Sequence, residues 1–330
     1  MVDLLAQFRQ LTRPPTGAEP GARFAGSPIP GYETHRIAVD AEGFPALLVS
    51  VLPGDVREPP IVLDHVVMQQ GIECRVSEPD GSVQVGRFTL IRCTGGDPLL
   101  VDYFLRIGSS VIPLLGSTPT ASDVSGVISR LVELFRAVLA PPRKSVQGLW
   151  GELFVISRAA DAPTLVRAWH ADAEDRYDFS MGSQRLEIKT VRGRERVHHF
   201  SLDQVVPAAG TEVLIASLFV ESAGAGTSLG ELIEKARTNV RSNPELALKI
   251  DQIIGLTLGE RVLVSLDHRF DVELAEESLR FYEASAIPTP NPDLPSEVSE
   301  VRFRSNISRV TPIELTTYRE QGDVFAAALR

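Results

Sequence analysis

The stretch 178-DFSMGSQRLEIKTVR-192 decides the fold of the second half of this chain. Its residues 185–192 alternate Leu, Ile and Val with charged side chains, a pattern typical of a β-strand. Met181-Gly182-Ser183-Gln184 has the composition of a tight turn, and the residues before it, about 174–181, form a second predicted strand. The stretch therefore predicts a β-hairpin.

This hairpin would bring acidic side chains together. Side chains two positions apart in a strand point to the same face, so Glu187 and Lys189 share one face and Ile188 takes the other. The turn can also place Asp178 beside Glu187. Two carboxylates at bonding distance repel one another unless a cation lies between them, and Mg²⁺ favours such oxygen ligands. A solvated hairpin face would explain the same residues without a metal.

Glu152 is a further acid in an unusual position. The segment 145–160, SVQGLWGELFVISRAA, predicts a helix with Ser145 as its N-cap, and Glu152 falls on the apolar side of that helix. An unpaired carboxylate in a dry environment is costly, and a nearby metal ion or its water would remove that cost. Gly148 and Gly151 are poor residues for a helix interior, so they would let the helix approach a sheet closely.

The chain divides by pattern into two domains. Residues 1–140 form a predicted β-rich N-terminal domain that would recognise DNA or a partner, and residues 141–330 form the second domain. The first contains a helix at 2–12, a Pro/Gly-rich loop at 13–31, strands that include 99–107, and a helix at 122–140. After the helix at 145–160 we expect strands at about 174–181, 185–192, 196–200 and 211–221, and helices at 201–206 and 228–241. The predicted class is α/β (α+β).

Composition limits the possible functions. The net charge of −10 and the pI of about 5.2 argue against nucleic-acid binding by bulk attraction, although a local basic patch stays open. No run of about 18 apolar residues and no secretory signal occurs, so we expect a cytoplasmic protein that does not span a membrane. Cys74 and Cys93 have no metal-ligand spacing and are expected in the core.

A local basic patch is predicted just after the hairpin, in 192-RGRERVHH-199. Arg192, Arg194 and Arg196 would lie on one face if the strand continues, where they could contact phosphate groups. A solvated edge strand is the alternative. His198 is a candidate for phosphate or metal-water contact, or else a strand-end residue. Gln204 could lie near the site or simply cap the helix that begins after Ser201.

These residues resemble the PD-(D/E)XK nuclease superfamily. An acid in a helix, an Asp in one strand and Glu-X-Lys in the next follow the superfamily's motif, on a restriction-endonuclease-like αβββαβ core that residues 145–221 fit. The resemblance implies that Asp178 and Glu187 bind the metal and that Lys189 is the catalytic lysine. It also implies that Glu152 is the helix acid, which would hold a metal-bound water. Tyr177 stands where the name-giving motif has proline, a change that removes no ligand.

A wider resemblance covers most of the chain. The segments GLWGELFVI, RYDFSM, LEIKTV, VHHFSLDQ and the late LPxxVSxVRFRSNIS are similar to a bacterial PD-(D/E)XK family encoded in phage-defence and restriction-like operons. This similarity implies partner proteins, namely a MutL-like ATPase and a helicase-like ATPase. The chain could also form a homodimer.

The resulting hypothesis is a metal-dependent DNA endonuclease of a bacterial defence or restriction-like system. Mg²⁺ is the expected cofactor, and Mn²⁺ is expected to substitute for it. The alternative is a catalytically inactive nuclease-fold subunit that binds DNA or a partner ATPase. An acid–base enzyme acting on a small molecule is a weaker idea, because the sequence contains neither a Gly-rich phosphate loop nor a Ser-His-Asp set.

Overall fold

The computed structural model describes residues 2–14, 22–52, 59–170, 175–290, 295, 298–313, 318 and 323–328. The chain divides into two compact units. Unit 1 contains residues 1–140 and 241–251, and unit 2 contains residues 141–240 and 252–330. The division predicted from the sequence at 140/141 differs from this one at the segment 241–251.

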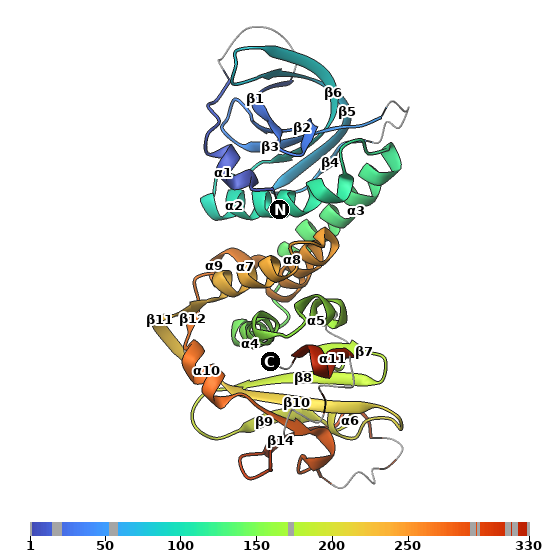
Figure 1. The fold of residues 1–330 in the computed structure, drawn as a ribbon, viewed down its shortest axis with the longest axis vertical. Helices are drawn as coiled ribbons and strands as arrows, with labels where there is room; N and C mark the ends of the chain where they lie inside the picture. Colours follow the sequence, from blue (N-terminus) through green and yellow to red (C-terminus); the bar gives the residue numbers. More distant parts are fainter. Residues whose placement is uncertain are drawn as a thin grey trace. The chain divides into compact units, whose positions relative to one another are not determined.

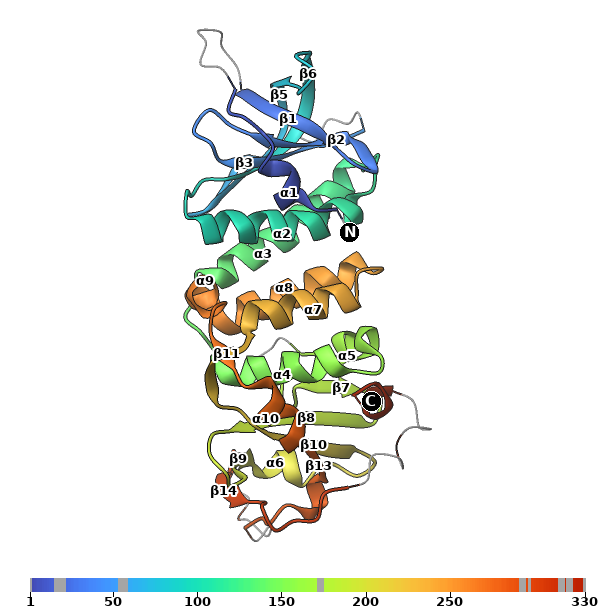
Figure 2. The same cartoon turned by 60° about the vertical axis from the view of Figure 1, so that its left-hand side comes forward.

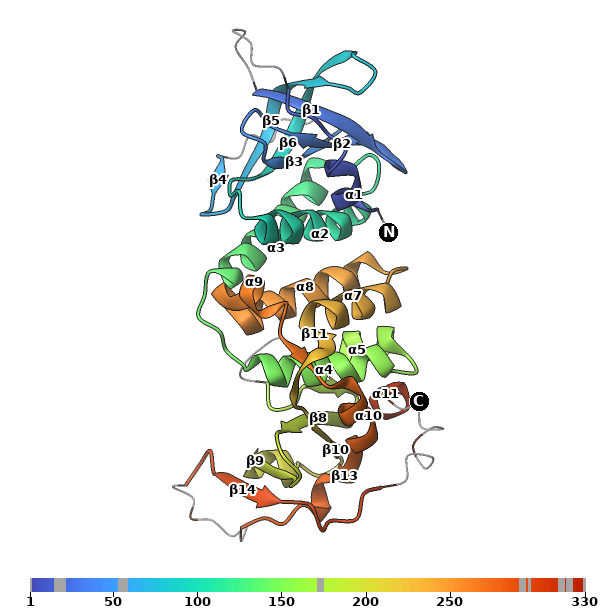
Figure 3. The same ribbon diagram turned by 90° about the vertical axis from the view of Figure 1, so that its left-hand side faces the viewer.

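Unit 1 is built on a sheet whose main strands close into a barrel, called the ring below (Figure 3). Its strands are β1 (Ala22–Ile29), β2 (Tyr32–Val39), β3 (Pro45–Ser50), β4 (Ile61–Val62), β5 (Val66–Ser77) and β6 (Val83–Cys93). They follow the order β1-β2-β3-β6-β5-β4, and β1 also pairs in parallel with β5, which closes the ring. The ring has an apolar interior formed by Phe24, Ala38, Ala46, Leu48, Cys74, Val76, Phe88 and Leu90.

The helices of unit 1 are α1 (Leu4–Phe8), α2 (Pro98–Leu115) and α3 (Ala121–Val138). The predicted strand at 99–107 is wrong, because these residues lie in α2. Asp97 caps that helix by accepting a hydrogen bond from the N–H of Leu99 at 2.9 Å, and Pro98 stands in the first turn, where its missing N–H has no cost. The predicted loop at 13–31 is also partly wrong, because β1 begins at Ala22; residues 15–21 of that loop lie outside the described residues.

Among the described residues, α2 is the one helix that is long and apolar enough to cross a membrane, by length and composition alone. Of its 18-residue window, 61% is buried inside the structure, as in the core helix of a folded domain. Apolar residues on most sides of a helix also explain the failed strand prediction, since they hide the helical period.

Unit 2 is built on a mixed sheet of order β13-β10-β8-β7 (Figure 2). Its strands are β7 (Phe179–Met181), β8 (Gln184–Val191), β10 (Glu212–Phe219) and β13 (Arg280–Glu283). β7 and β8 form the predicted hairpin, with Met181 opposite Gln184 and Gly182 in the turn at φ 53°. β10 runs parallel to β8, and β13 runs antiparallel to β10. Two further pairs are β9 (Val197–Ser201) with β14 (Arg302–Asn306) and β11 (Ser222–Ser228) with β12 (Arg269–Phe270).

Helices cover one face of the four-stranded sheet (Figures 1 and 2). α4 (Val146–Arg158) packs on β8, while α5 (Ala162–Ala168) and α11 (Asp323–Ala328) pack at β7. α7 (Leu229–Asn239) packs on α4, so that residues 149–157 of α4 are buried without interruption. The remaining helices of unit 2 are α6 (Leu202–Val205), α9 (Val262–Ser265) and α10 (Val272–Ser278), with 3₁₀ turns at Gly259–Arg261 and Ala284–Ala286. The residues of α8 (Pro244–Leu258) up to 251 belong to unit 1 and the rest to unit 2.

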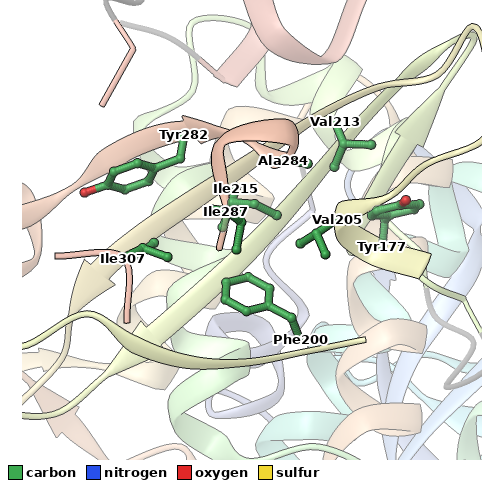
Figure 4. Packing of buried hydrophobic residues seen from close by; sticks show 9 residues of the cluster. All are labelled: Tyr177, Phe200, Val205, Val213, Ile215, Tyr282, Ala284, Ile287 and Ile307. Atoms are coloured by element: carbon green, nitrogen blue, oxygen red, sulfur yellow. The ribbon is translucent and has the colours of Figure 1, made fainter. Parts of the chain in front are cut away.

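The opposite face of the sheet is covered by β9, β14 and α6. Between them and the sheet lies the apolar cluster of Figure 4, formed by Tyr177, Phe200, Val205, Val213, Ile215, Tyr282, Ala284, Ile287 and Ile307. The sheet therefore has a covered surface on both sides, and polar groups of its strands that lie between the layers must find partners within the protein.

The predicted α+β class and element order are confirmed: α4, β7, β8, β9, α6, β10 and α7 follow one another as expected, with α5 added after α4 and β11 added before α7. β7 is shorter than the strand predicted at 174–181, and residues 171–174 lie outside the described residues. This shortness matters for the site, because part of the edge of β8 has no strand partner within the described part of the chain.

Candidate active site

The site lies just before the first residue of β7. Among the described residues no strand pairs with this edge of β8 beyond Leu186, and the side chain of Asp178 takes that place: its Oδ2 accepts a hydrogen bond from the N–H of Ile188 at 2.9 Å. The N–H of Asp178 in turn donates to Oε2 of Glu187 at 3.3 Å. The two acids of the predicted motif are thus held together at the open edge of the sheet.

Glu152 approaches from α4. Its side chain is buried, and Oε2 accepts a hydrogen bond from the indole N–H of Trp169 at 2.6 Å. α4 can lie this close to β8 because residue 151 is glycine. A Cβ at Gly151 would come within 2.3 Å of Cγ2 of Thr190. The predicted close approach is therefore real at Gly151, whereas a Cβ on Gly148 would meet only Ser145 Oγ, the cap of the helix, at 3.3 Å.

Lys144 joins Glu152 to Asp178. Its ammonium lies 3.1 Å from Oε1 of Glu152 and 2.8 Å from Oδ1 of Asp178. The main chain of Lys144 is held by Thr257, whose carbonyl oxygen accepts hydrogen bonds from the N–H groups of Arg143 and Lys144 at 2.9 and 3.3 Å. The sequence motif does not predict Lys144 as a site residue, because Lys144 precedes the helix and has no fixed spacing from the motif acids. The motif does not predict Trp169 either.

Lys189 lies on the same face of β8 as Glu187, as strand alternation predicts. Its ammonium contacts Oε1 of Glu187 at 2.6 Å and stands over the ring of Phe200, 5.4 Å from the ring centre. Gln204 both caps α6, accepting from the N–H of Ser201 at 3.2 Å, and donates to Oε1 of Glu187 at 3.0 Å. Gln204 therefore both caps the helix and lies beside Glu187, the two positions that the sequence left open.

The cluster contains more negative than positive charge, with the carboxyl groups of Glu152, Asp178 and Glu187 against the ammonium groups of Lys144 and Lys189. Burial, with a further contribution from Asp178, raises the pKa of Glu152 to about 8 and that of Glu187 to about 7. Burial alone would lower the pKa of Lys144, but Asp178 and Glu152 together raise it well above its usual value. The cluster therefore favours additional positive charge.

Among the described residues, no set of three or more Asp, Glu, His or Cys side chains is arranged to hold a metal ion as it stands. The donor set nevertheless suits one. Carboxylate oxygens are the ligands of hard divalent cations, and Oδ1 of Asp178 and Oε1 of Glu152 already share one cation, the Lys144 ammonium. Glu187 turns Oε1 toward Lys189 and Gln204 instead.

Comparison with known proteins agrees with this geometry. A family model described as "Putative PD-(D/E)XK family member, (DUF4420)" matches residues 5–308. The chain belongs to this PD-(D/E)XK family. The searches of curated proteins and of solved structures gave no match.

The acid–acid–Lys set at the site is consistent with membership in the PD-(D/E)XK family. The predicted basic patch, however, is wrong at Arg196. The strand does not continue through 192–195, and Arg196 is buried. Its guanidinium donates to the carbonyl oxygen and hydroxyl of Ser217, at 2.7 and 2.8 Å, and to the carbonyl oxygen of Ser278, and it stacks on Phe219. These contacts leave it no surface from which to reach a phosphate.

His198 is buried as well, and a phosphate or metal-water contact is not open to it in this structure. Its Nε2 lies 2.8 Å from the hydroxyl of Ser217, and burial lowers its pKa to about 3. Arg192 and Arg194 are exposed on the turn between β8 and β9, and Nε of Arg192 donates to Gln147 at 3.2 Å. Their contact with DNA stays a prediction.

Proposed function

We propose that this chain is a metal-dependent nuclease that hydrolyses phosphodiester bonds in DNA. One observation carries the proposal: three carboxylates and a lysine lie together at the edge of β8. They come from α4 and from both sides of the β7–β8 turn, and they are Glu152, Asp178, Glu187 and Lys189. Membership in a PD-(D/E)XK family supports a nuclease-type fold, and the four residues supply the side chains of that motif.

Asp178, Glu187 and Glu152 would hold the cation, and Mg²⁺ or Mn²⁺ suits their oxygen donors. A divalent cation bound there would stabilise negative charge on the phosphate and lower the pKa of water. Glu152, held by Trp169 on the side of α4, would also accept a hydrogen bond from a metal-bound water.

Lys189 would stabilise the charge that develops on the phosphate or orient the attacking water. Glu187 and Gln204 fix the position of its ammonium, and the ring of Phe200 supports it. A preorganised cation beside the reacting phosphate stabilises the transition state more than a mobile one, because it needs no reorganisation during the reaction.

The proposal is tested by incubating the purified protein with plasmid and linear DNA in Mg²⁺ or Mn²⁺. We expect wild type to cleave, and Glu187→Gln and Lys189→Met to lose at least about 100-fold in rate, the usual effect of removing one transition-state contact. Lys235→Met, on the exposed side of α7, is the matched control and should cleave as wild type does. Equal cleavage by all four proteins would identify a contaminating nuclease and remove the proposal.

A second candidate is a non-cleaving subunit that binds DNA or a partner ATPase. It is favoured by the net charge of −10 and by the cluster itself, in which Lys144 and Lys189 supply two positive charges against three carboxyl groups. Calorimetry distinguishes the two: absence of Mn²⁺ binding together with tight partner binding would favour the subunit.

The cellular setting belongs to the same proposal. The segments that resemble defence-associated proteins suggest a bacterial phage-defence or restriction-like system in the cytoplasm. A MutL-like and a helicase-like ATPase would be the partners, and the ring-shaped sheet of unit 1 would recognise DNA or a partner. Co-purification of tagged protein from its own host, followed by mass spectrometry, would identify the partners.

A further inference from the structure

Lys144 holds the one pair of carboxylate oxygens in the cluster that no fixed donor occupies. The other oxygens are committed: Oδ2 of Asp178 to the N–H of Ile188 and Oε2 of Glu152 to the indole of Trp169. In Glu187, Oε2 accepts from a main-chain N–H, and Oε1 from two side chains. Oδ1 of Asp178 and Oε1 of Glu152 are left, and both face the Lys144 ammonium.

The Lys144 ammonium can move away from its carboxylate partners more easily than the other donors can. It lies in the irregular segment between α3 and α4, and its side chain is 35% exposed, against 17% for Lys189. Its main chain is fixed by Thr257, so the flexible four-carbon stem can move while the segment stays in place. The carboxylates themselves are nearly covered, with exposures of 5% for Glu152 and 9% for Asp178.

We infer that Lys144 is a resident cation that competes with the divalent metal for Glu152 and Asp178, and that metal binding displaces its ammonium. This inference rests on the proposed function, because it concerns the same site. In the metal-free protein Lys144 compensates two buried acids that would otherwise repel one another. When the metal binds, it must replace these two charge-assisted hydrogen bonds, so Lys144 lowers the apparent metal affinity.

The lysine content of the chain permits a direct test without any variant. Only four lysines occur, Lys144, Lys189, Lys235 and Lys249, so their side-chain NH₃⁺ or Cε signals can be resolved by NMR in lysine-labelled protein. Titration with Mg²⁺ should shift the Lys144 signal strongly and speed the exchange of its ammonium protons with water. The signals of Lys235 and Lys249 should not move. Lys144 protons that stay protected with metal bound would overturn the inference.

Calorimetry with Mn²⁺ supplies the second measurement. Lys144→Met should bind the metal about 10- to 100-fold more tightly than wild type, the range expected when one competing hydrogen-bonded charge is removed. Lys144→Gln, which keeps a donor without the charge, should lie between them, and Lys235→Met should match wild type. Circular dichroism shows whether each variant is folded. If a variant is not folded, the NMR titration of the wild-type protein still tests the inference.

The outcomes separate this inference from the proposed function. Metal binding by wild type with equal or weaker binding by Lys144→Met would overturn the competition and leave the nuclease proposal standing. Absence of metal binding in wild type and in both Lys144 variants would overturn the competition and the metal-dependent function together. Tighter binding by Lys144→Met with no DNA cleavage would support the competition and reject the nuclease.

Discussion

Glu152 shows how a single buried acid depends on its neighbours. It is 3% exposed within a fully covered helix, and its two oxygens are held by Trp169 and Lys144. Burial raises its pKa to about 8, so the folded protein retains a proton that the unfolded chain releases near pH 4.5. A raised acid pKa means that stability is lost as the pH rises between the unfolded and folded values.

We therefore expect the free energy of unfolding of the metal-free protein to fall between about pH 4.5 and 8, because Glu152 and Glu187 both keep a proton in the folded protein. Below pH 6.5 His198, whose pKa is lowered to about 3 by burial, contributes in the opposite direction and makes the fall less steep. Glu152→Gln should remove much of the fall, as should a saturating divalent cation. Urea unfolding at several pH values measures the difference, and identical pH profiles for wild type and variant would contradict the expectation.

Arg196 is the opposite case, a charge used inside the protein. Arg196→Met leaves the carbonyl oxygens of Ser217 and Ser278 without their donor, and we expect it to cost about 2–4 kcal/mol of stability. Arg194→Met, on the exposed turn, removes the same charge and should change stability by less than about 0.5 kcal/mol. Thermal unfolding of both variants checks this, and equal melting temperatures would place Arg196 at the surface after all.

At the scale of elements, the contact of α4 with β8 decides where Glu152 can reach. Gly151 is the point of closest approach, since a Cβ there would come within 2.3 Å of Thr190. Alanine is favoured over glycine in a helix by about 1 kcal/mol, but an overlap of this size costs about 1–3 kcal/mol and moves the helix. The overlap therefore outweighs the propensity.

We expect Gly151→Ala to destabilise the protein and to weaken metal binding, because Glu152 moves with the helix. Adding Thr190→Ser should restore both, since it removes the methyl group that the new Cβ meets and keeps the hydroxyl that bonds to Gln147. A double-mutant cycle followed by unfolding and calorimetry measures the coupling. Additive effects of the two substitutions would show that the contact is not the cause.

The sequence predicts the β7–β8 hairpin well, because its strands surround a clear turn and carry charged residues between apolar ones. Prediction fails where apolar residues hide the period: 99–107 lies in a helix, although Asp97 and Pro98 before it form a helix-start signal. It fails also at Arg196 and His198, because alternation along a strand does not tell which face another layer covers. Lys144 could not be found from spacing, because it meets Glu152 and Asp178 only in three dimensions.

At the scale of the whole molecule, a net charge of −10 sets the conditions for DNA binding. The protein's overall field repels DNA, so contacts with phosphate must be local and few. Arg192 and Arg194 are exposed near the site and remain the candidates for such contacts after Arg196 and His198 are assigned to the interior.

We expect DNA affinity in the absence of metal to fall steeply as salt rises from 50 to 200 mM. Replacing Arg192 and Arg194 by glutamine should reduce the slope of log affinity against log salt by about one for each lost contact. The matched control, glutamine at Arg302 and Arg304 on the exposed side of β14, changes the net charge equally. Fluorescence anisotropy with labelled DNA gives both slopes, and the same slope for the two double variants would exclude a specific role of the turn.

The segment 241–251 belongs to unit 1 although it follows most of the strands of unit 2 in the sequence. A chain made from its N-terminus cannot complete unit 1 at residue 140; it must wait until residue 251 has been added, 111 residues later. At about 5–20 residues per second this delay is roughly 6 to 22 seconds, during which α4 and β7 to β10 also emerge. Unit 1 is therefore completed only after the first strands of unit 2 have been made, and a gene fusion that joins another N-terminal domain at residue 140 would leave 241–251 without the unit to which it belongs.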